Sequence, residues 1–175
     1  PPTLERSPLG VSLLHPLSWE VDIPLAWPSA IRQRVRNDYP LLGCLELGVS
    51  AVRTPATDLN DSFRARRLAI MRDEGVSVVA TLIWSDDVDV DQLLRDHAGN
   101  VDSWELQLPG ILRLRERHCQ FLRQHTDRPI CLSTIIPDEV HPDKQHARTR
   151  HGFWPEELAE LDNHLRAADI RLDRV

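Results

Sequence analysis

Residues 75–84 constrain the fold of this chain more than any other part of the sequence. They form a nearly unbroken apolar run, rich in β-branched side chains, and the polar residues Ser85, Asp86 and Asp87 follow it. A strand with one face in water alternates apolar and polar residues, and this run scarcely does. Its many Val, Ile and Thr residues favour extended chain over a buried helix. We therefore predict a strand that is buried on both faces, as in a parallel sheet covered by helices.

Similar segments flank this run, and helical patterns separate them. Further strands are predicted at residues 49–54, 103–108 and 129–137. Helices are predicted at residues 61–74, 89–97 and 111–125, and a final helix opens at residues 153–157. These connections are too long for hairpins, so parallel strands joined by right-handed crossover helices are expected.

The first part of the chain has a different character. Residues 1–27 are predicted to form an irregular N-terminal extension, because prolines interrupt this part of the chain. Two short segments within it are candidates for extended chain. Pro28 suits the first turn of a helix, and Ile31 and Val35 then predict a short amphipathic helix that ends near Asn37. A second short helix is predicted for residues 40–47, ending at Gly48.

The alternation of strands and helices resembles part of a TIM barrel. The resemblance covers about residues 49–175, lies at the level of the fold and rests on no family-specific motif. Each strand–helix unit takes roughly 25 to 30 residues, and a full barrel typically needs about 250. The resemblance therefore implies an α/β fold whose parallel sheet of repeated βα units is a partial barrel, completed by further chain or by a second copy. The alternative is an open, doubly wound sheet.

Residues 1–175 are expected to form a single α/β domain. The chain opens without an initiator Met and ends on a segment that resembles the start of another strand, so we expect a fragment of a longer polypeptide. Residues 138–152 break the strand–helix rhythm because they are polar and carry no periodic apolar residues. They are predicted to be a polar loop.

Composition excludes several classes of protein. Apolar residues make up 41% of the chain and charged residues 27%, and the formal net charge is −6. These values are typical of a globular protein, and no basic block indicates binding to nucleic acid or to a membrane surface. Three cysteines without a C-x-x-C pattern indicate thiols of a reducing compartment. No apolar run is long enough to span a membrane, so a cytoplasmic location is expected.

Arg53 and Glu105 are the main candidates for a functional site. In both candidate folds, ligands bind beyond the carboxyl ends of the parallel strands. Arg53 and Glu105 lie in alternate strands, which in a barrel contribute to the same interior layer. We predict that Arg53 binds an anionic group of the substrate and that Glu105 acts as an acid–base group or a metal ligand. A structural ion pair, or exposure at a strand end, is the alternative for both.

Other candidates lie near the ends of the predicted strands. The substrate-binding candidates are Thr81, Trp84, Gln107 and Thr134. Trp84 could instead cover the core where strands meet helices. His118 and Cys119 are adjacent on a predicted helix, so we expect a surface histidine beside a core cysteine. The acidic residues 86–91 lack the glycine and the distal glutamate of a calcium-binding loop, and we interpret them as a loop followed by a helix N-cap.

A divalent metal is the cofactor that the sequence leaves open. His141, His146 and His151 recur in the polar loop, and His141 and His146 are the candidate metal ligands. Their spacing does not place them on one face of a helix, and the zinc motif H-E-x-x-H is absent. A solvated loop without metal is the alternative.

These observations predict a TIM-barrel-like enzyme segment that acts on a small polar or anionic substrate as a lyase, isomerase or hydrolase. No G-x-G-x-x-G, phosphate loop or G-x-S-x-G pattern is present, which argues against nucleotide-dependent and serine-hydrolase chemistry. The alternative is a non-catalytic accessory or oligomerisation domain of a larger protein. The expected partners are a small-molecule substrate and either a second copy or the remaining parts of a larger chain.

Overall fold

The chain has an α/β fold. The computed structural model describes residues 7–13, 17–26, 29–109, 114–125, 129–137 and 149–172. Its five-stranded parallel sheet is built from βα units and curls through 201° into a half-barrel, and the chain also forms a β-hairpin. The predicted parallel sheet of repeated βα units is therefore confirmed. The chain divides into two compact units, residues 1–79 and 80–175.

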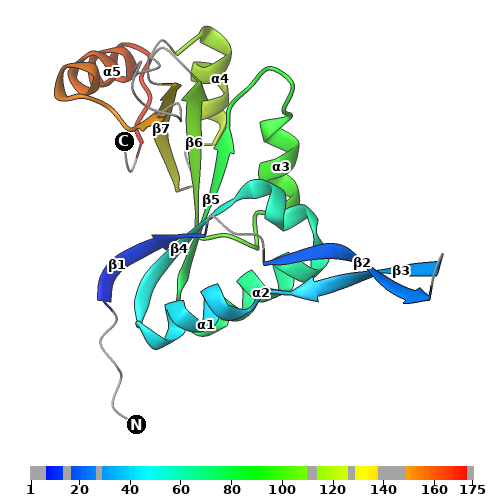
Figure 1. Cartoon of the computed structure of the whole chain (residues 1–175). Helices are drawn as coiled ribbons and strands as arrows, with labels where there is room; N and C mark the ends of the chain where they lie inside the picture. The colour runs from blue at the N-terminus through cyan, green and yellow to red at the C-terminus, as the bar shows by residue number, and fades with distance from the viewer. Residues whose placement is uncertain are drawn as a thin grey trace, which may run out of the picture. The chain divides into compact units, whose positions relative to one another are not determined.

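The first unit contains two sheet strands, a hairpin and two α-helices. Its elements are β1 (Ser7–Ser12), β2 (Ser18–Ala26), β3 (Ser29–Arg36), α1 (Tyr39–Glu46), β4 (Val49–Pro55), the 3-10 helix η1 (Ala56–Asn60) and α2 (Ser62–Asp73) (Figure 1). β1 pairs with β4 in parallel, and β2 pairs with β3 in antiparallel fashion. Val52 of β4 and Leu68 and Met71 of α2 are buried in the core.

The second unit continues the alternation of strands and helices. Its elements are most of β5 (Ser77–Ile83), then α3 (Val90–Asp96), β6 (Ser103–Pro109), α4 (Glu116–Gln124), β7 (Ile130–Pro137), β8 (Thr149–His151) and α5 (Pro155–Ala167). β6 and β7 are parallel, and β8 is antiparallel to β7. Strand β8 lies in the segment that was predicted to be a polar loop, and residues 138–148 of that segment lie outside the described residues.

The described strands of the main sheet follow the order β1-β4-β5-β6-β7-β8. The boundary between the two compact units falls within β5, so the single domain expected from the sequence stays a prediction. Among the described residues, no helix has the length and apolar character needed to cross a bilayer.

The helix predicted after Pro28 is wrong, because these residues form β3. Arg32 and Arg34 of β3 lie within ion-pair distance of Glu20 on β2, and Arg32 also pairs with Asp22. Alternate residues of a strand share a face, so the arginines of β3 meet the acidic residues of β2 in register. The pairing of β3 with β2 therefore outweighed the preference for a helix that Pro28 indicates. By contrast, the strands β1 and β2 overlap the two extended candidates that were predicted within the N-terminal extension.

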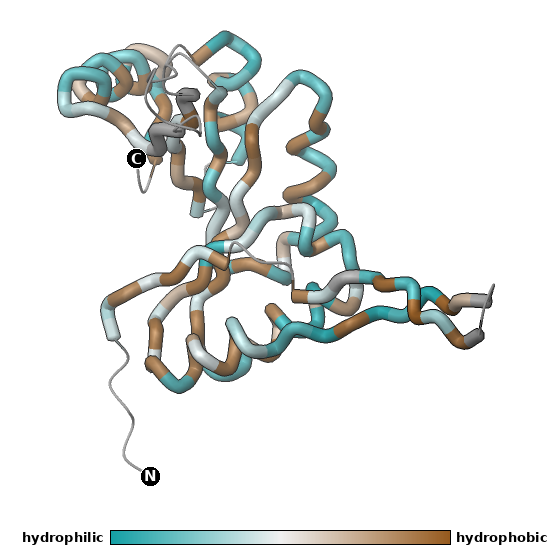
Figure 2. Tube along the Cα trace, viewed as in Figure 1, coloured by the Kyte–Doolittle hydropathy of each residue, from teal (hydrophilic) through white to brown (hydrophobic). Residues whose placement is uncertain are grey.

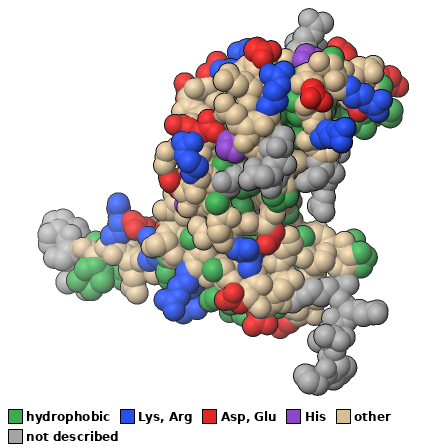
Figure 3. Space-filling model, turned by 180° about the vertical axis from the view of Figure 1, so that it is seen from behind, with side chains coloured by type: hydrophobic (Ala, Val, Ile, Leu, Met, Phe, Trp, Pro, Cys, Tyr) green, Lys and Arg blue, Asp and Glu red, His purple; other side chains and the backbone are tan. Residues whose placement is uncertain are grey.

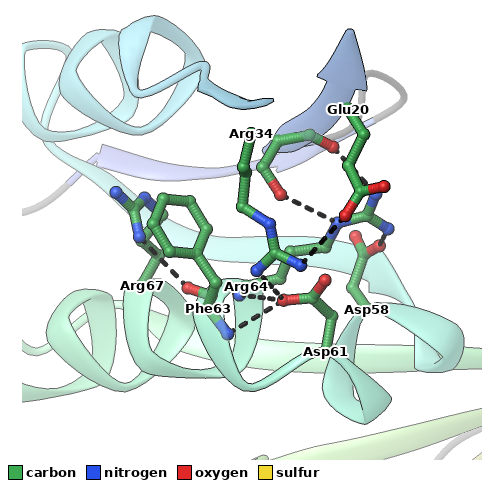
Figure 4. Close-up of polar contacts among 8 residues, drawn as sticks. Glu20, Arg34, Asp58, Asp61, Phe63, Arg64 and Arg67 are labelled. Carbon is green, nitrogen blue, oxygen red and sulfur yellow. Dashed lines mark hydrogen bonds and ion pairs between the residues drawn. The ribbon is translucent and has the colours of Figure 1, made fainter. Parts of the chain in front are cut away.

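Arginines hold the hairpin against the start of α2. Arg64 donates hydrogen bonds to Asp58 Oδ1 at 2.8 Å and to the Ser18 carbonyl oxygen at 2.8 Å. Arg34 donates to Asp61 Oδ1 at 3.2 Å. Figure 4 shows these side chains converging on the N-terminal end of α2. The hairpin is thus tied to the rest of the first unit through charge-assisted hydrogen bonds.

One face of the central strands is fully buried and the other is only partly covered. Val78 and Ala80 of β5 are buried, whereas Ile83 is 46% exposed. The prediction that residues 75–84 are buried on both faces is therefore wrong for one face. A closed barrel fills its interior with side chains from all around, and a half-barrel provides only part of that wall. Figure 2 shows the apolar residues that recur along the strands and the hydrophilic stretches of α5.

Candidate functional site

The carboxyl ends of β5 and β6 and the start of α4 surround a cavity of about 310 Å³, which we call the strand-end cavity. Its lining residues are Trp84, Ser85, Asp86, Leu108, Pro109, Arg115, Arg117 and His118. Ligands of parallel α/β folds bind at this end of the strands. The cavity therefore has the location that the fold predicts for a binding site.

Two arginines and one carboxylate define the charge of the strand-end cavity. Arg117 donates a hydrogen bond to Asp86, and Arg115 Nη1 lies 3.7 Å from Asp86 Oδ2. The hydrogen bond from Arg117 holds the pKa of Asp86 below its usual value. All three side chains are exposed at the rim. Two guanidinium groups against one carboxylate leave a net positive charge, which suits a carboxylate or phosphate group.

A neighbouring cavity of about 210 Å³ shares Trp84, Asp86 and Arg117 but has the opposite charge, because Asp89 and Asp91 also line it. The Asp89 carboxylate accepts a hydrogen bond from the Gln92 backbone N–H at 2.9 Å. Asp91 Oδ1 lies 2.6 Å from His125 Nε2. These carboxylates are thus engaged within the fold, as expected of the helix N-cap predicted for this acidic run. Of these two neighbouring cavities, the strand-end cavity is the one whose described residues favour an anion.

His118 lies buried in the wall of the strand-end cavity, and its ring centroid is 4.5 Å from that of Trp84. Burial lowers the pKa of His118, and the charges of Arg117 and Arg115 lower it further. The Arg115 backbone N–H donates to His118 Nδ1 at 3.1 Å, while Arg117 Nε lies 3.3 Å from Nε2. A neutral imidazole has only one acceptor nitrogen. Both ring nitrogens of His118 face an N–H donor, so only one of these two contacts is a hydrogen bond while the ring is neutral.

The expectation of a surface histidine at position 118 is therefore wrong. Trp84 and Phe121 pack together at a centroid distance of 4.9 Å, and the His118 ring joins this aromatic group. Cys119 is buried as expected, and burial raises the pKa of its thiol. Trp84 itself lines the cavity yet is almost fully buried, so it acts chiefly as part of the core.

Glu105 lies on the half-buried face of β6 with two hydrogen-bond donors. Ser133 Oγ donates to Glu105 Oε1 at 2.6 Å, and Gln107 Nε2 donates to the same oxygen at 3.3 Å. Gln107 lies opposite Ser133 in the parallel register, so alternation places all three side chains on one face. We call these three residues the Glu105 cluster.

The other predicted substrate-binding residues are dispersed. Thr134 is fully buried and donates to the Leu108 carbonyl oxygen at 3.0 Å, so its hydroxyl is engaged away from the Glu105 cluster. Thr81 is half-buried in β5, and Arg53 is half-buried in β4 of the first unit. Pro109 follows Glu105 by four residues, or roughly 13 Å along a strand. The Glu105 cluster and the strand-end cavity are therefore separate groups.

The predicted metal ligands His141 and His146 lie outside the described residues. In the part of the chain that the structure describes, no group of three or more His, Cys, Asp or Glu side chains is placed to hold a metal ion.

Sequence reasoning missed Arg115 and Arg117, interpreted His118 as a surface residue and selected Thr134 in place of Ser133. Position offered one signal for Arg115, Arg117 and His118, because they lie within ten residues after the strand end at residue 109, where the fold predicts a site. No protein-family model, curated protein or solved structure matches this chain. The chemistry of the described side chains therefore carries the functional conclusion.

Proposed function

We propose that this protein is a segment of an α/β enzyme that binds a small anionic substrate in the strand-end cavity. The pair Arg115 and Arg117 carries the proposal, because Asp86 is the only carboxylate among the described residues that line this cavity. Guanidinium groups bind carboxylate and phosphate oxygens through paired hydrogen bonds. Binding at the carboxyl ends of β5 and β6 agrees with the usual site of parallel α/β folds.

Two ionisable groups are candidates for proton transfer, and of these His118 lines the strand-end cavity whereas Glu105 does not. His118 lines the cavity, and its lowered pKa favours the neutral imidazole, so a ring nitrogen can accept a proton from a bound substrate. Glu105 is the second group, and we retain it as an acid–base group or metal ligand next to Ser133 and Gln107. Proton transfer is common to lyases, isomerases and hydrolases, so the reaction class stays open among these three. Arg53 does not line this cavity, so its role in binding an anionic group stays a prediction.

Anion binding tests the proposal directly. Small dicarboxylates and sugar phosphates are titrated into the purified chain, and heat or Trp fluorescence is followed. Arg117→Ala should weaken binding by roughly 10- to 100-fold, since a charge-assisted hydrogen bond contributes about 1.5–3 kcal/mol. Asp86→Asn should strengthen binding, because it removes the carboxylate that competes for both arginines.

Arg123→Ala is the matched control. Arg123 is an exposed arginine of the same helix α4, and it pairs with Glu116. This variant should bind the anion as the parent chain does. An equal loss of affinity in Arg123→Ala and Arg117→Ala would refute a specific site, as would an Asp86→Asn variant with unchanged affinity.

The second candidate is a non-catalytic accessory or oligomerisation domain. Strand β1 stands at one end of the strand order, and its Leu9 is 68% exposed. An edge strand offers N–H and C=O groups to a strand of another chain. Light scattering over a range of concentrations tests this reading. An oligomer that Leu9→Lys dissociates would support it, whereas a monomer at all concentrations would count against it.

A further inference from the structure

Helices α1 and α2 form a groove in the first unit that the strand-end cavity does not involve. The groove encloses about 650 Å³, and ten residues from Arg36 to Met71 line it. Leu42 of α1 and Ile70 of α2 line it while 52% and 50% exposed, respectively. Large apolar side chains that are left half in water, on two adjacent helices, mark an interaction surface.

The apolar surface extends along α1 beyond the groove. Tyr39 and Leu47, near the two ends of α1, are 86% and 73% exposed and do not line the cavity. A small ligand confined to the groove would leave them in water. At 100° per residue, Tyr39 lies about 60° from Leu42 around α1, so an elongated partner that follows α1 can cover both, whereas Leu47 faces away from the groove. The shape of the exposed apolar surface therefore favours a helix over a small molecule.

Arginines give the groove its charge. Arg36, Arg66 and Arg67 line it together with a single carboxylate, Asp38. Arg67 Nε donates to Asp38 Oδ1 at 2.6 Å, and Arg36 donates to the other oxygen of the same carboxylate. Arg66 is exposed and has no ion pair among the described residues. The rim therefore carries more positive than negative charge.

Arg67 is held in place before any partner binds. Its guanidinium carbon lies 3.4 Å from the centroid of the Phe63 ring, and Nη1 donates to the Phe63 carbonyl oxygen at 3.2 Å. Figure 4 shows the Arg67 side chain beside Phe63 at the start of α2. In the space-filling view of Figure 3, basic side chains likewise lie beside apolar ones in the lower part of the molecule. A fixed cation loses little side-chain entropy on binding.

We propose that the α1–α2 groove is a docking site for an amphipathic helix of a partner protein, with acidic residues flanking its apolar stripe. The apolar stripe lies against Leu42 and Ile70, and the acidic residues pair with Arg36 and Arg66. Helix-in-groove recognition uses apolar anchors at i, i+3/i+4 and i+7, while charge complementarity sets the choice of partner.

Three labelled peptides test the proposal in a fluorescence anisotropy titration with the full chain. The first is a designed helix with leucines at i, i+3, i+4 and i+7 and glutamates beside them. The second has lysines in place of the glutamates, and the third has the first composition in scrambled order. The glutamate helix should bind about tenfold or more tightly than either of the others.

Two variants locate the binding. Ile70→Glu should abolish binding of the glutamate helix, and Arg66→Glu should weaken it by about tenfold. Arg95→Glu, an exposed arginine of α3, should leave it unchanged. Circular dichroism verifies folding, and Leu42→Glu replaces Ile70→Glu if that variant does not fold.

Several outcomes would overturn the proposal. Equal binding of the glutamate and lysine helices, or unchanged affinity in Ile70→Glu and Arg66→Glu, would show that the groove does not select an acidic helix. Self-association that Ile70→Glu abolishes, without peptide binding, would identify a second copy as the occupant. Binding of decanoate in place of every peptide would identify a small amphiphile.

Discussion

His118 is buried in the folded chain, and burial there disfavours its protonated form. The neutral ring is stable between Trp84 and the start of α4, and both burial and the nearby arginines lower its pKa. The unfolded chain, by contrast, protonates a histidine near pH 6.5. Below about that pH the unfolded state therefore binds more protons than the folded state.

We expect this difference to appear as a pH-dependent stability. The stability of the folded state that depends on a neutral His118 is fully present above about pH 6.5. It is lost as the pH falls through the lowered pKa of His118 in the folded state. His118→Gln should therefore lose less stability than the parent chain between pH 7.5 and pH 5. Urea denaturation at the two pH values measures the difference. The same loss in both proteins would contradict the assignment of a lowered pKa.

Asp58 offers a second test at the residue scale. It is buried, and it accepts hydrogen bonds from Thr54 Oγ1 at 2.9 Å and from Arg64 Nη1 at 2.8 Å. Asp58→Ala leaves the largely covered Arg64 without this partner, so the free energy of unfolding should fall by about 2–4 kcal/mol. Arg166→Ala breaks an exposed pair with Asp162 and should cost less than about 1 kcal/mol. Similar losses in the two variants, measured by urea denaturation, would refute the distinction.

At the scale of elements, Asp61 defines where α2 begins. Its Oδ1 accepts hydrogen bonds from the backbone N–H groups of Phe63 at 2.9 Å and Arg64 at 3.2 Å, as an N-cap does. The same oxygen accepts a hydrogen bond from Arg34 of the hairpin. The start of the helix and the attachment of β3 therefore depend on one carboxylate.

Substitution of this cap should cost more than an ordinary N-cap. Asp61→Ala should lower the free energy of unfolding by more than the roughly 1 kcal/mol typical of a lost cap, because the contact with Arg34 is lost as well. Asp89→Ala removes the cap of α3, which contacts the Gln92 backbone N–H, and serves as the comparison. Thermal or urea unfolding measures both. A larger loss in Asp89→Ala would contradict the double role of Asp61.

At the scale of the whole molecule, β5 is an interior strand of the main sheet. It stands between β4 and β6 in the sheet, and Val78 near its start is fully buried. Backbone hydrogen bonds on both sides of one strand make its neighbours depend on it. We therefore expect β4 and β6 to open together.

Val78→Ala tests this coupling. The lost methyl groups should lower the free energy of unfolding by about 1–3 kcal/mol. Amide hydrogen exchange should accelerate by a similar factor in β4 and in β6, because both exchange through one opening. Ile83→Ala, at the exposed end of the same strand, is the control and should change exchange little. Acceleration confined to one of the two strands would contradict cooperative opening.

Local pattern alone determined the elements between residues 49 and 137. The period of the apolar residues, the helix caps and the terminating glycines all act within a few neighbouring residues. The sequence therefore predicts the positions of the elements β4, α2, β5, α3 and β6. Trp84 and Glu105 could be selected as candidates because the ends and faces of these strands were already predictable. The parallel sheet followed from the lengths of the connections.

Only the tertiary structure decided which residues meet. Pairing with β2 made β3 a strand despite Pro28, and the register of β6 with β7 brought Ser133, not Thr134, to Glu105. The packing of α4 placed Arg117 on Asp86 and buried His118. Each of these contacts joins residues distant in the sequence or depends on which face of an element is covered. Periodicity along one segment carries no information about its partner, so such contacts are set only when the elements pack.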